Sequence, residues 1–242
     1  AEVLYFVGCA GSFDDRGKKI AQAMVRVLQK AGVDFAILGP EESCNGDVAR
    51  RAGNEYIAQM LIQQNVAVLN QYKPGRILTG CPHCYNIIKN EYPQFGASYD
   101  VVAHSEFLME LVNNGRLQPA ASGNGFDSLT FHDSCYLGRW NGIYRAPRDL
   151  LSTMTHGTRL TEMARTQSKG FCCGAGGARM FMEETLGTRI NASRAEEIIS
   201  TGAQTVAAAC PFCATMLRDG IRDKESDVEV KDIVEIVDEA IS

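Results

Sequence analysis

The sequence contains no run that approaches the ~18–20 apolar residues a helix needs to cross a bilayer. It also lacks an opening segment in which basic residues precede an apolar stretch, the pattern of a secretory signal. Lys and Arg number 24 against 29 Asp and Glu, so the net charge is −5 and no basic excess is present to bind a phosphate backbone. We therefore expect no nucleic-acid partner.

The chain has no initial Met and opens at Ala1, directly before a strand-like apolar run at 3–7. This start is typical of a processed chain or of a domain cut from a longer polypeptide. Any membrane anchor would then lie in a missing segment or on a partner. With 242 residues, of which 45% are hydrophobic, the chain can form one large domain or two of roughly 120 residues each.

Nine cysteines are the most informative part of the composition. Their odd number and the lack of an export signal argue against a disulfide framework, and in a reducing compartment clustered cysteines are metal ligands or redox catalysts. The first half contains Cys9, Cys44, Cys81 and Cys84, and the second contains Cys135, Cys172, Cys173, Cys210 and Cys213.

These cysteines form two matched sets. The offset between the halves is 126 residues for Cys9 and 129 residues for the other three cysteines. Cys81 follows Cys44 by 37 positions, and Cys210 follows Cys173 by the same number. The spacing predicts a duplicated unit, in which Ser43 stands at the position of Cys172. A polar stretch with Gly, Ser and Pro at 118–125 reads as the linker, which places the units at 1–118 and 126–242.

Each predicted unit alternates strands with amphipathic helices. In the first we expect strands at 3–7, 35–38, 76–79 and 99–103, and helices at 18–31, 47–71 and 105–113. In the second we expect strands at 129–132 and 205–209, and helices at 188–202 and 232–241. The predicted fold is α/β, with two tandem Rossmann-like units, each a small and mainly parallel sheet with helices on both faces.

Four of the cysteines stand at or just past the carboxyl end of a predicted strand: Cys9, Cys81, Cys135 and Cys210. Doubly wound sheets bind their ligands along that edge. We therefore expect the thiols of each unit to converge there from separate strands.

The five thiols of the second unit exceed the four ligands of a tetrahedral zinc site. Soft thiolates select zinc, Cu(I) or iron–sulfur clusters, and the surplus thiol favours a cluster. Gly174, Gly176 and Gly177 would let the backbone approach closely, with free N–H groups pointing at cluster sulfurs. A zinc-stapled binding module without redox chemistry remains the first alternative.

A proline inside Cys81-Pro82-His83-Cys84 and Cys210-Pro211-Phe212-Cys213 predicts the first turn of a helix, where its missing N–H costs nothing. The helix amino terminus stabilises thiolates, which suits a cluster and equally a thioredoxin-type dithiol. A dithiol oxidoreductase using Cys81 and Cys84 is thus the second alternative. Its weakness is that such a catalyst has no use for upstream cysteines repeated at a fixed distance.

Several other residues could have either a functional or a purely structural role. His83 and His132 flank ligand cysteines, and a structural or supporting role is favoured for both. Trp140, Arg139 and Arg145 suit either a docking surface or ordinary packing.

The cysteine pattern as a whole resembles a known family. Cys135, then Cys172-Cys173-Gly174, then Cys210-Pro211-Phe212-Cys213 resemble the cysteine-rich CCG domain, of which the chain would carry two copies, the first degenerate. This domain occurs in heterodisulfide reductase and in the iron–sulfur subunits of glycolate and lactate oxidation systems. The stretches 132–139, 171–179 and 187–191 are similar to the carboxyl-terminal part of bacterial heterodisulfide-reductase-related Fe–S oxidoreductases, which are linked to electron flow between electron-transfer flavoprotein and menaquinone.

The resemblance implies the cofactors. In the family a complete five-cysteine set binds a noncubane [4Fe–4S] cluster, which here would be held by Cys135, Cys172, Cys173, Cys210 and Cys213. The first unit departs from the pattern at Ser43, and its four cysteines suffice for a cubane [4Fe–4S] cluster. Heterodisulfide cleavage in the family uses two noncubane clusters, so Ser43 favours electron relay over disulfide reduction.

The resemblance also implies partners and location. Electrons would arrive from an electron-transfer flavoprotein or a ferredoxin-type subunit and leave to a quinone or to a thiol/disulfide acceptor. The chain would act as an oxidoreductase subunit or domain in the cytoplasm. A quinone-reactive membrane subunit could hold it at the inner face of the membrane.

Overall fold

The computed structural model of the chain describes residues 1–121 and 126–241. The first half contains β1 (Val3–Tyr5), α1 (Gly8–Phe13), α2 (Asp15–Lys30), β2 (Phe35–Ala36), α3 (Asp47–Arg51), α4 (Glu55–Tyr72), β3 (Ile77–Thr79), α5 (Pro82–Asn90), β4 (Val101–Ala103) and α6 (His104–Asn113). The second half contains β5 (Leu129–His132), α7 (Arg145–Met154), α8 (Ile190–Ser200), β6 (Thr205–Ala208), α9 (Pro211–Asp223), β7 (Glu229–Asp232) and α10 (Ile233–Ala240).

The strands form two separate sheets. The first has the order β2-β1-β3-β4 and the second the order β5-β6-β7. Every pairing in both sheets is parallel, with registers such as Leu4 opposite Ile77 and Thr130 opposite Val206. The predicted α/β class with two parallel sheets is confirmed. Since the strands of a sheet run the same way, their carboxyl ends lie along one edge.

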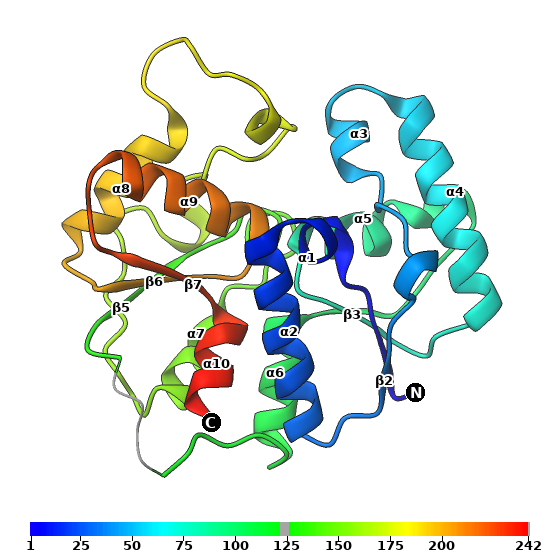
Figure 1. Cartoon of the computed structure of the whole chain (residues 1–242), viewed down its shortest axis with the longest axis horizontal. Helices are drawn as coiled ribbons and strands as arrows, with labels where there is room; N and C mark the ends of the chain where they lie inside the picture. Colours follow the sequence, from blue (N-terminus) through cyan, green and yellow to red (C-terminus); the bar gives the residue numbers. More distant parts are fainter. Residues whose placement is uncertain (122–125, 242) are drawn as a thin grey trace.

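Four helices pack together between the two sheets. The carboxyl-terminal helix α10 contacts α2, α6 and α7, and α6 contacts α7 (Figure 1). Arg26 of α2 donates to Asp238 of α10 at 2.8 Å, and Arg16 pairs with Glu235. The apolar core runs through this packing as one cluster that contains strand residues of both sheets, for example Ile77 and Val206, and helix residues such as Ile236. The two halves are therefore joined by buried surface.

Some predicted elements differ from the structure. The expected helix at 47–71 is broken into α3 and α4, because Gly53 has a φ of +86° and Asn54 caps the next helix by accepting a hydrogen bond from the Ile57 N–H at 3.1 Å. The expected strand at 35–38 pairs only at Phe35–Ala36. Helix α7 and strand β7 were not expected. Residues 122–125 of the predicted linker lie outside the described residues.

No helix among the described residues has both the length and the apolar character of a membrane span.

Candidate metal centre

The four cysteines of the first half converge from three segments. Cys9 lies in α1, just beyond β1, Cys44 lies in the loop before α3, and Cys81 and Cys84 open α5. The thiols of Cys9 and Cys44 are close enough to shift each other's pKa, and so are the thiols of Cys81 and Cys84. Cys9, Cys81 and Cys84 also line one small cavity. We call these four thiols the first set.

The five cysteines of the second half form a continuous chain of thiol contacts. Cys135 follows β5, Cys172 and Cys173 lie in the loop before α8, and Cys210 and Cys213 open α9. Neighbouring thiols in this chain shift each other's pKa: Cys135 and Cys172, Cys172 and Cys173, Cys173 and Cys213, and Cys213 and Cys210. Three of the five are buried. We call these thiols the second set.

The two sets lie next to each other. The thiol of Cys81, at the amino terminus of α5, is close enough to the thiol of Cys210, at the amino terminus of α9, for each to shift the pKa of the other. Both thiols are buried, at 5% and 1% exposure. The cysteine spacing predicted two separate convergences, and the contact between them was not predicted. The two sets are therefore neighbours at the amino termini of α5 and α9.

The chemistry of the thiols fits an iron–sulfur centre, because iron is held by thiolates. A hydrogen bond from Cys9 lowers the pKa of Cys44 to about 6. Hydrogen bonds from Cys135 and Cys173 lower the pKa of Cys172 to about 2. Hydrogen bonds from Cys210 and Cys84 place the pKa of Cys81 well below its usual value. Each set thus contains at least one thiol that is ionised at neutral pH.

Two glycines bring backbone close to these sulfurs. A Cβ atom on Gly8, whose φ is +78°, would lie 3.1 Å from Sγ of Cys84. Gly174 has a φ of +93° and donates its N–H to Sγ of Cys172 at 3.3 Å. A side chain at either position would strain the backbone and crowd its neighbours. Gly176 has no such constraint, since nothing lies within 4 Å of a Cβ built there.

His132 adds a nitrogen to the second set. One of its ring nitrogens lies within 4.8 Å of the sulfurs of Cys173 and Cys213. Burial, followed by the charge of Arg194, lowers the pKa of His132 to about 3, so the ring is neutral. Arg194 Nε donates to Nδ1 at 3.1 Å, which leaves the proton on Nε2. Within the described residues Nε2 is buried without a hydrogen-bond partner, as a donor to a cluster sulfur or thiolate would be.

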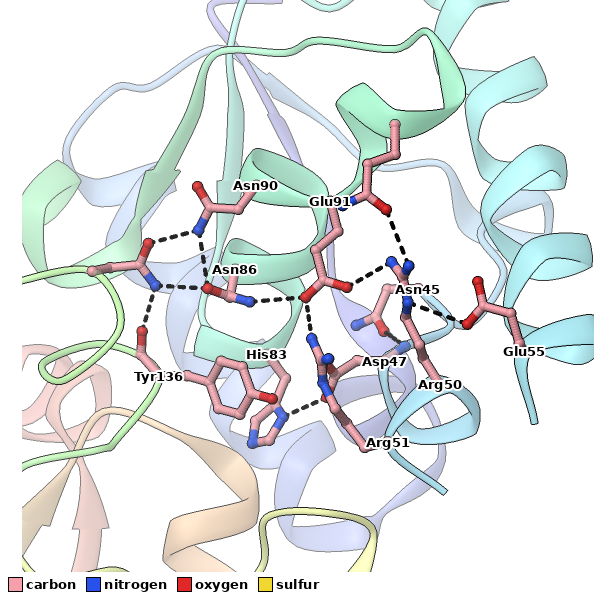
Figure 2. Close-up of polar contacts among 12 residues, drawn as sticks. Asn45, Asp47, Arg50, Arg51, Glu55, His83, Asn86, Asn90, Glu91 and Tyr136 are labelled. Atoms are coloured by element: carbon pink, nitrogen blue, oxygen red, sulfur yellow. Dashed lines mark hydrogen bonds and ion pairs between the residues drawn. The ribbon is translucent and has the colours of Figure 1, made fainter. Parts of the chain in front are cut away.

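His83, which directly precedes Cys84 of the first set, belongs to a polar network with Asp47 and Arg51 (Figure 2). Its Nδ1 lies 2.7 Å from Asp47 Oδ2, and Asp47 also pairs with Arg51 at 3.1 Å. Burial opposes the charged ring, but the hydrogen bond to Asp47 and the thiolate of Cys81 outweigh it, so the pKa of His83 is raised. In the same network Asn45 donates to Sγ of Cys84 at 2.8 Å.

Rings from both halves meet beside the cysteines. His83 lies 4.4 Å from the ring of Tyr136 and 5.0 Å from that of Phe212, measured between centroids. Tyr136 follows Cys135, and Phe212 lies between Cys210 and Cys213. Trp140 stacks on Tyr136 at 6.1 Å and is 68% exposed, so this group of rings reaches the surface.

The structure brings together every cysteine that was expected to bind metal. What the sequence did not reveal was the contact between the sets, the role of Asn45, and the pairing of Arg194 with His132. For Asn45 the sequence offered only a weak signal, its position directly after Cys44. Arg194 offered none, because it reaches His132 across 62 positions.

Comparison with known proteins agrees with the duplicated pattern. The CCG model, described as a cysteine-rich domain, matches residues 3–89 and again residues 129–218. The chain is 44% identical over 242 residues to the probable iron–sulfur-binding oxidoreductase FadF of Bacillus subtilis, covering 99% of the chain and 34% of that protein. It is 43% identical over 245 residues to the EtfAB:quinone oxidoreductase of Syntrophomonas wolfei, covering 98% and 34%.

A third relative is a subunit of a heterodisulfide reductase. The chain is 33% identical over 247 residues to one subunit of the dihydromethanophenazine:CoB–CoM heterodisulfide reductase of Methanosarcina barkeri, covering 100% of the chain and 59% of that protein. The chain thus spans about a third of the length of the first two relatives. Because each CCG match contains one set of cysteines and the two cover most of the sequence, the chain belongs to the CCG cysteine-rich domain family and carries the domain twice.

Proposed function

We propose that the chain is the iron–sulfur electron-transfer module of an oxidoreductase and that each set of cysteines holds one cluster. The observation that carries this proposal is the convergence of nine thiols into two sets that meet at Cys81 and Cys210. The iron–sulfur and oxidoreductase names of the relatives support it.

The two sets differ in the cluster that suits them. For the second set, with its five thiols, we propose a noncubane [4Fe–4S] cluster held by Cys135, Cys172, Cys173, Cys210 and Cys213. For the first set, with Ser43 beside Cys44, we propose a cubane [4Fe–4S] cluster with four cysteine ligands. The backbone of Ser43 is fixed by Asn65, whose Oδ1 accepts from the Ser43 N–H at 3.1 Å.

When bound, such clusters supply one-electron transfer. The residues of the chain hold the ligands, exclude water and donate hydrogen bonds. Cys81 and Cys84 are almost fully buried, as are Cys173, Cys210 and Cys213. Asn45 Nδ2 and the Gly174 N–H donate to ligand sulfurs, which stabilises their negative charge and raises the reduction potential.

For the whole protein we propose a place between a redox protein and a final acceptor. The donor would be an electron-transfer flavoprotein or a ferredoxin-type subunit, as the name of the Syntrophomonas relative suggests for that protein. The acceptor would be a quinone or a thiol/disulfide compound. The chain would work in the cytoplasm, at the inner membrane face when a quinone-reactive subunit holds it, and its folding units would be 1–118 and 126–242.

A pair of ligand variants tests the assignment. In Cys173→Ser we expect the second cluster to be lost, the first to be retained, and the melting temperature to fall, because cluster binding contributes to folding. In Cys44→Ser we expect the first cluster to be lost and the second to be retained. Iron analysis and EPR of anaerobically purified protein measure both. A Cys173→Ser protein that kept full iron and its melting temperature would contradict the ligand assignment.

The same preparation separates the alternatives. A zinc-stapled module would be colourless and contain zinc. A dithiol oxidoreductase would be free of metal, with a disulfide that titrates at a defined potential. Nothing in the arrangement of the thiols favours either, because nine converging cysteines exceed the needs of both.

A further inference from the structure

A cavity of about 460 Å³ lies between the two halves of the chain. Helix α2 of the first half contributes Arg16 and Lys19 to its wall. From the second half, α9 contributes Arg218, and β7 and α10 contribute the rest. Helix α2 lies beside α10 here, and α9 packs against β7 (Figure 1). None of the described lining residues is a cysteine, so this cavity is separate from the two sets of thiols.

The guanidinium of Arg218 has no partner among the described residues. Its Nη2 atom is buried and forms no hydrogen bond there. Burial, followed by the charge of Arg16, lowers the pKa of Arg218. The guanidinium nevertheless stays charged, because arginine keeps its proton in proteins. A charged donor that is buried without a partner is destabilising, so we expect a partner that does not belong to this part of the chain.

The carboxylates in the wall of the cavity are bound to other cations. Glu235 pairs with Arg16 through both of its oxygens. Glu229 and Glu239 pair with Lys231, at 3.4 and 2.8 Å. All three carboxylates of the described lining are thus engaged, and the side chain that completes the site must come from a ligand.

The two cations that remain select for a doubly charged anion. Lys19 is exposed and faces the same cavity as Arg218. A single carboxylate would leave one of the two charges unbalanced. A phosphate group carries about −1.5 to −2 charges at pH 7, and its oxygens suit the planar fork of an arginine. The cavity volume lies within the roughly 300–1,000 Å³ of small-molecule pockets, which leaves space for the organic part of a phosphate ester.

We propose that this cavity binds a phosphate group between Arg218 and Lys19, as the inorganic ion or as the monoester end of a small phosphorylated molecule. The site goes beyond the proposed electron transfer and does not depend on it. Because Lys19 belongs to α2 and Arg218 to α9, the bound phosphate joins the two halves of the chain. A ligand that binds only the folded chain stabilises it.

Calorimetry and thermal unfolding of the anaerobically purified, iron-containing chain test the proposal. The buffer contains no phosphate and has low ionic strength, because salt screens exposed charges. Inorganic phosphate, glycerol 3-phosphate and acetate are titrated separately. We expect at least one of the two phosphate compounds to bind at least tenfold more tightly than acetate and to raise the melting temperature. The compound that binds more tightly shows whether the site takes the free ion or an ester.

Two variants with matched controls assign the binding to the cavity. Arg218→Met keeps an unbranched side chain without the charge, and we expect it to weaken phosphate binding at least tenfold. We expect Lys19→Gln, at an exposed position, to weaken it at least threefold. The controls are Arg222→Met on the same helix α9 and Lys18→Gln on the same helix α2, since both of these cations pair with an aspartate. We expect both controls to stay within twofold of the original affinity.

The melting temperature without phosphate separates a binding role of Arg218 from a structural one. We expect Arg218→Met to melt no lower than the original chain, because the variant loses a buried donor that had no partner. A lower melting temperature would show that the guanidinium stabilises the fold without a ligand, and would overturn the proposal. Equal phosphate affinity of Arg218→Met and the original chain, or phosphate binding no tighter than acetate binding, would overturn it as well.

Iron content, measured on every sample, tests the proposed function separately. A chain without iron that still binds phosphate would contradict the electron-transfer function and support the phosphate site. A chain with full iron that binds no phosphate would do the reverse.

Discussion

At the scale of single residues, His132 is the side chain whose protonation the structure fixes most completely. Arg194 donates to its Nδ1 and burial keeps the ring neutral, so the proton is on Nε2, which is buried without a hydrogen-bond partner among the described residues. Arg194 is itself fully buried and pairs with Glu197 at 2.8 Å. This buried ion pair therefore determines which nitrogen of His132 carries the proton.

Replacing His132 with Phe should lower the reduction potential of the second cluster. The ring shape is preserved, and the hydrogen bond that stabilises the more negative, reduced state is lost. We expect a decrease on the order of 50 mV, because a hydrogen bond to a charged group contributes about 1.5–3 kcal/mol and part of this differs between redox states. A potentiometric titration followed by EPR measures it. An unchanged midpoint with full iron would show that His132 does not donate to the cluster.

Replacing Arg194 with Met should destabilise the fold by about 1–3 kcal/mol at pH 7, because the buried Glu197 loses one of its two arginine partners and keeps Arg165. Burial opposes ionisation of Glu197, but the Arg165 N–H and Arg194 outweigh it, so its pKa lies below 4.5. Its contribution to stability is therefore present above pH 4.5 and is lost as the pH falls through the lowered pKa.

Urea unfolding at neutral and at acidic pH checks this prediction. The difference between the original chain and Arg194→Met should shrink as the pH falls below 4.5. Arg222→Met is the matched control, because Arg222 pairs with Asp219 at 3.0 Å while 72% exposed, and we expect it to change stability by less than about 0.5 kcal/mol. Equal losses in the two variants would refute the role given to the buried pair.

At the scale of elements, helix starts and strand ends were predictable and helix breaks were not. Cys81 and Cys210 precede helices that begin at Pro82 and Pro211, as expected, because proline lacks the N–H that a first turn leaves unbonded. The break between α3 and α4 was missed because apolar periodicity continues across it, although Gly53 interrupts the backbone. Strand β7 was missed because Glu229 and Lys231 make it read as polar.

Helix α4 supports the loop that carries Cys44. Asn65 lies in the middle of α4, is fully buried, and donates to the carbonyls of Ser43 and Cys44 at 3.1 and 2.9 Å. The first set of thiols therefore depends on a helix that contributes no ligand of its own.

Replacing Asn65 with Ala should cost about 2–4 kcal/mol, because it leaves buried backbone groups of the Cys44 loop unpaired. We also expect loss of iron from the first cluster, with the EPR signal of the second unchanged. Gln63→Ala, at an exposed position of the same helix, is the control. Loss of both signals together would mean that Asn65 supports the whole fold and not this loop in particular.

At the scale of the whole molecule, the repeat in the sequence predicted two units and two sets of thiols, but not how they meet. The contact of Cys81 with Cys210 depends on the packing of α2, α6, α7 and α10, and of α1 against α9. Such packing joins residues more than a hundred positions apart, as Arg26 and Asp238 show, and leaves no local pattern. The cavity beside Arg218 was unpredictable for the same reason.

The most direct test is to measure iron and acid-labile sulfide per chain in protein purified without oxygen. The result shows whether both sets of thiols bind clusters. Two four-iron clusters give about eight iron and eight sulfide per chain, with little zinc. A preparation with no iron in either set of thiols would contradict the electron-transfer function and the ligand assignments that depend on it.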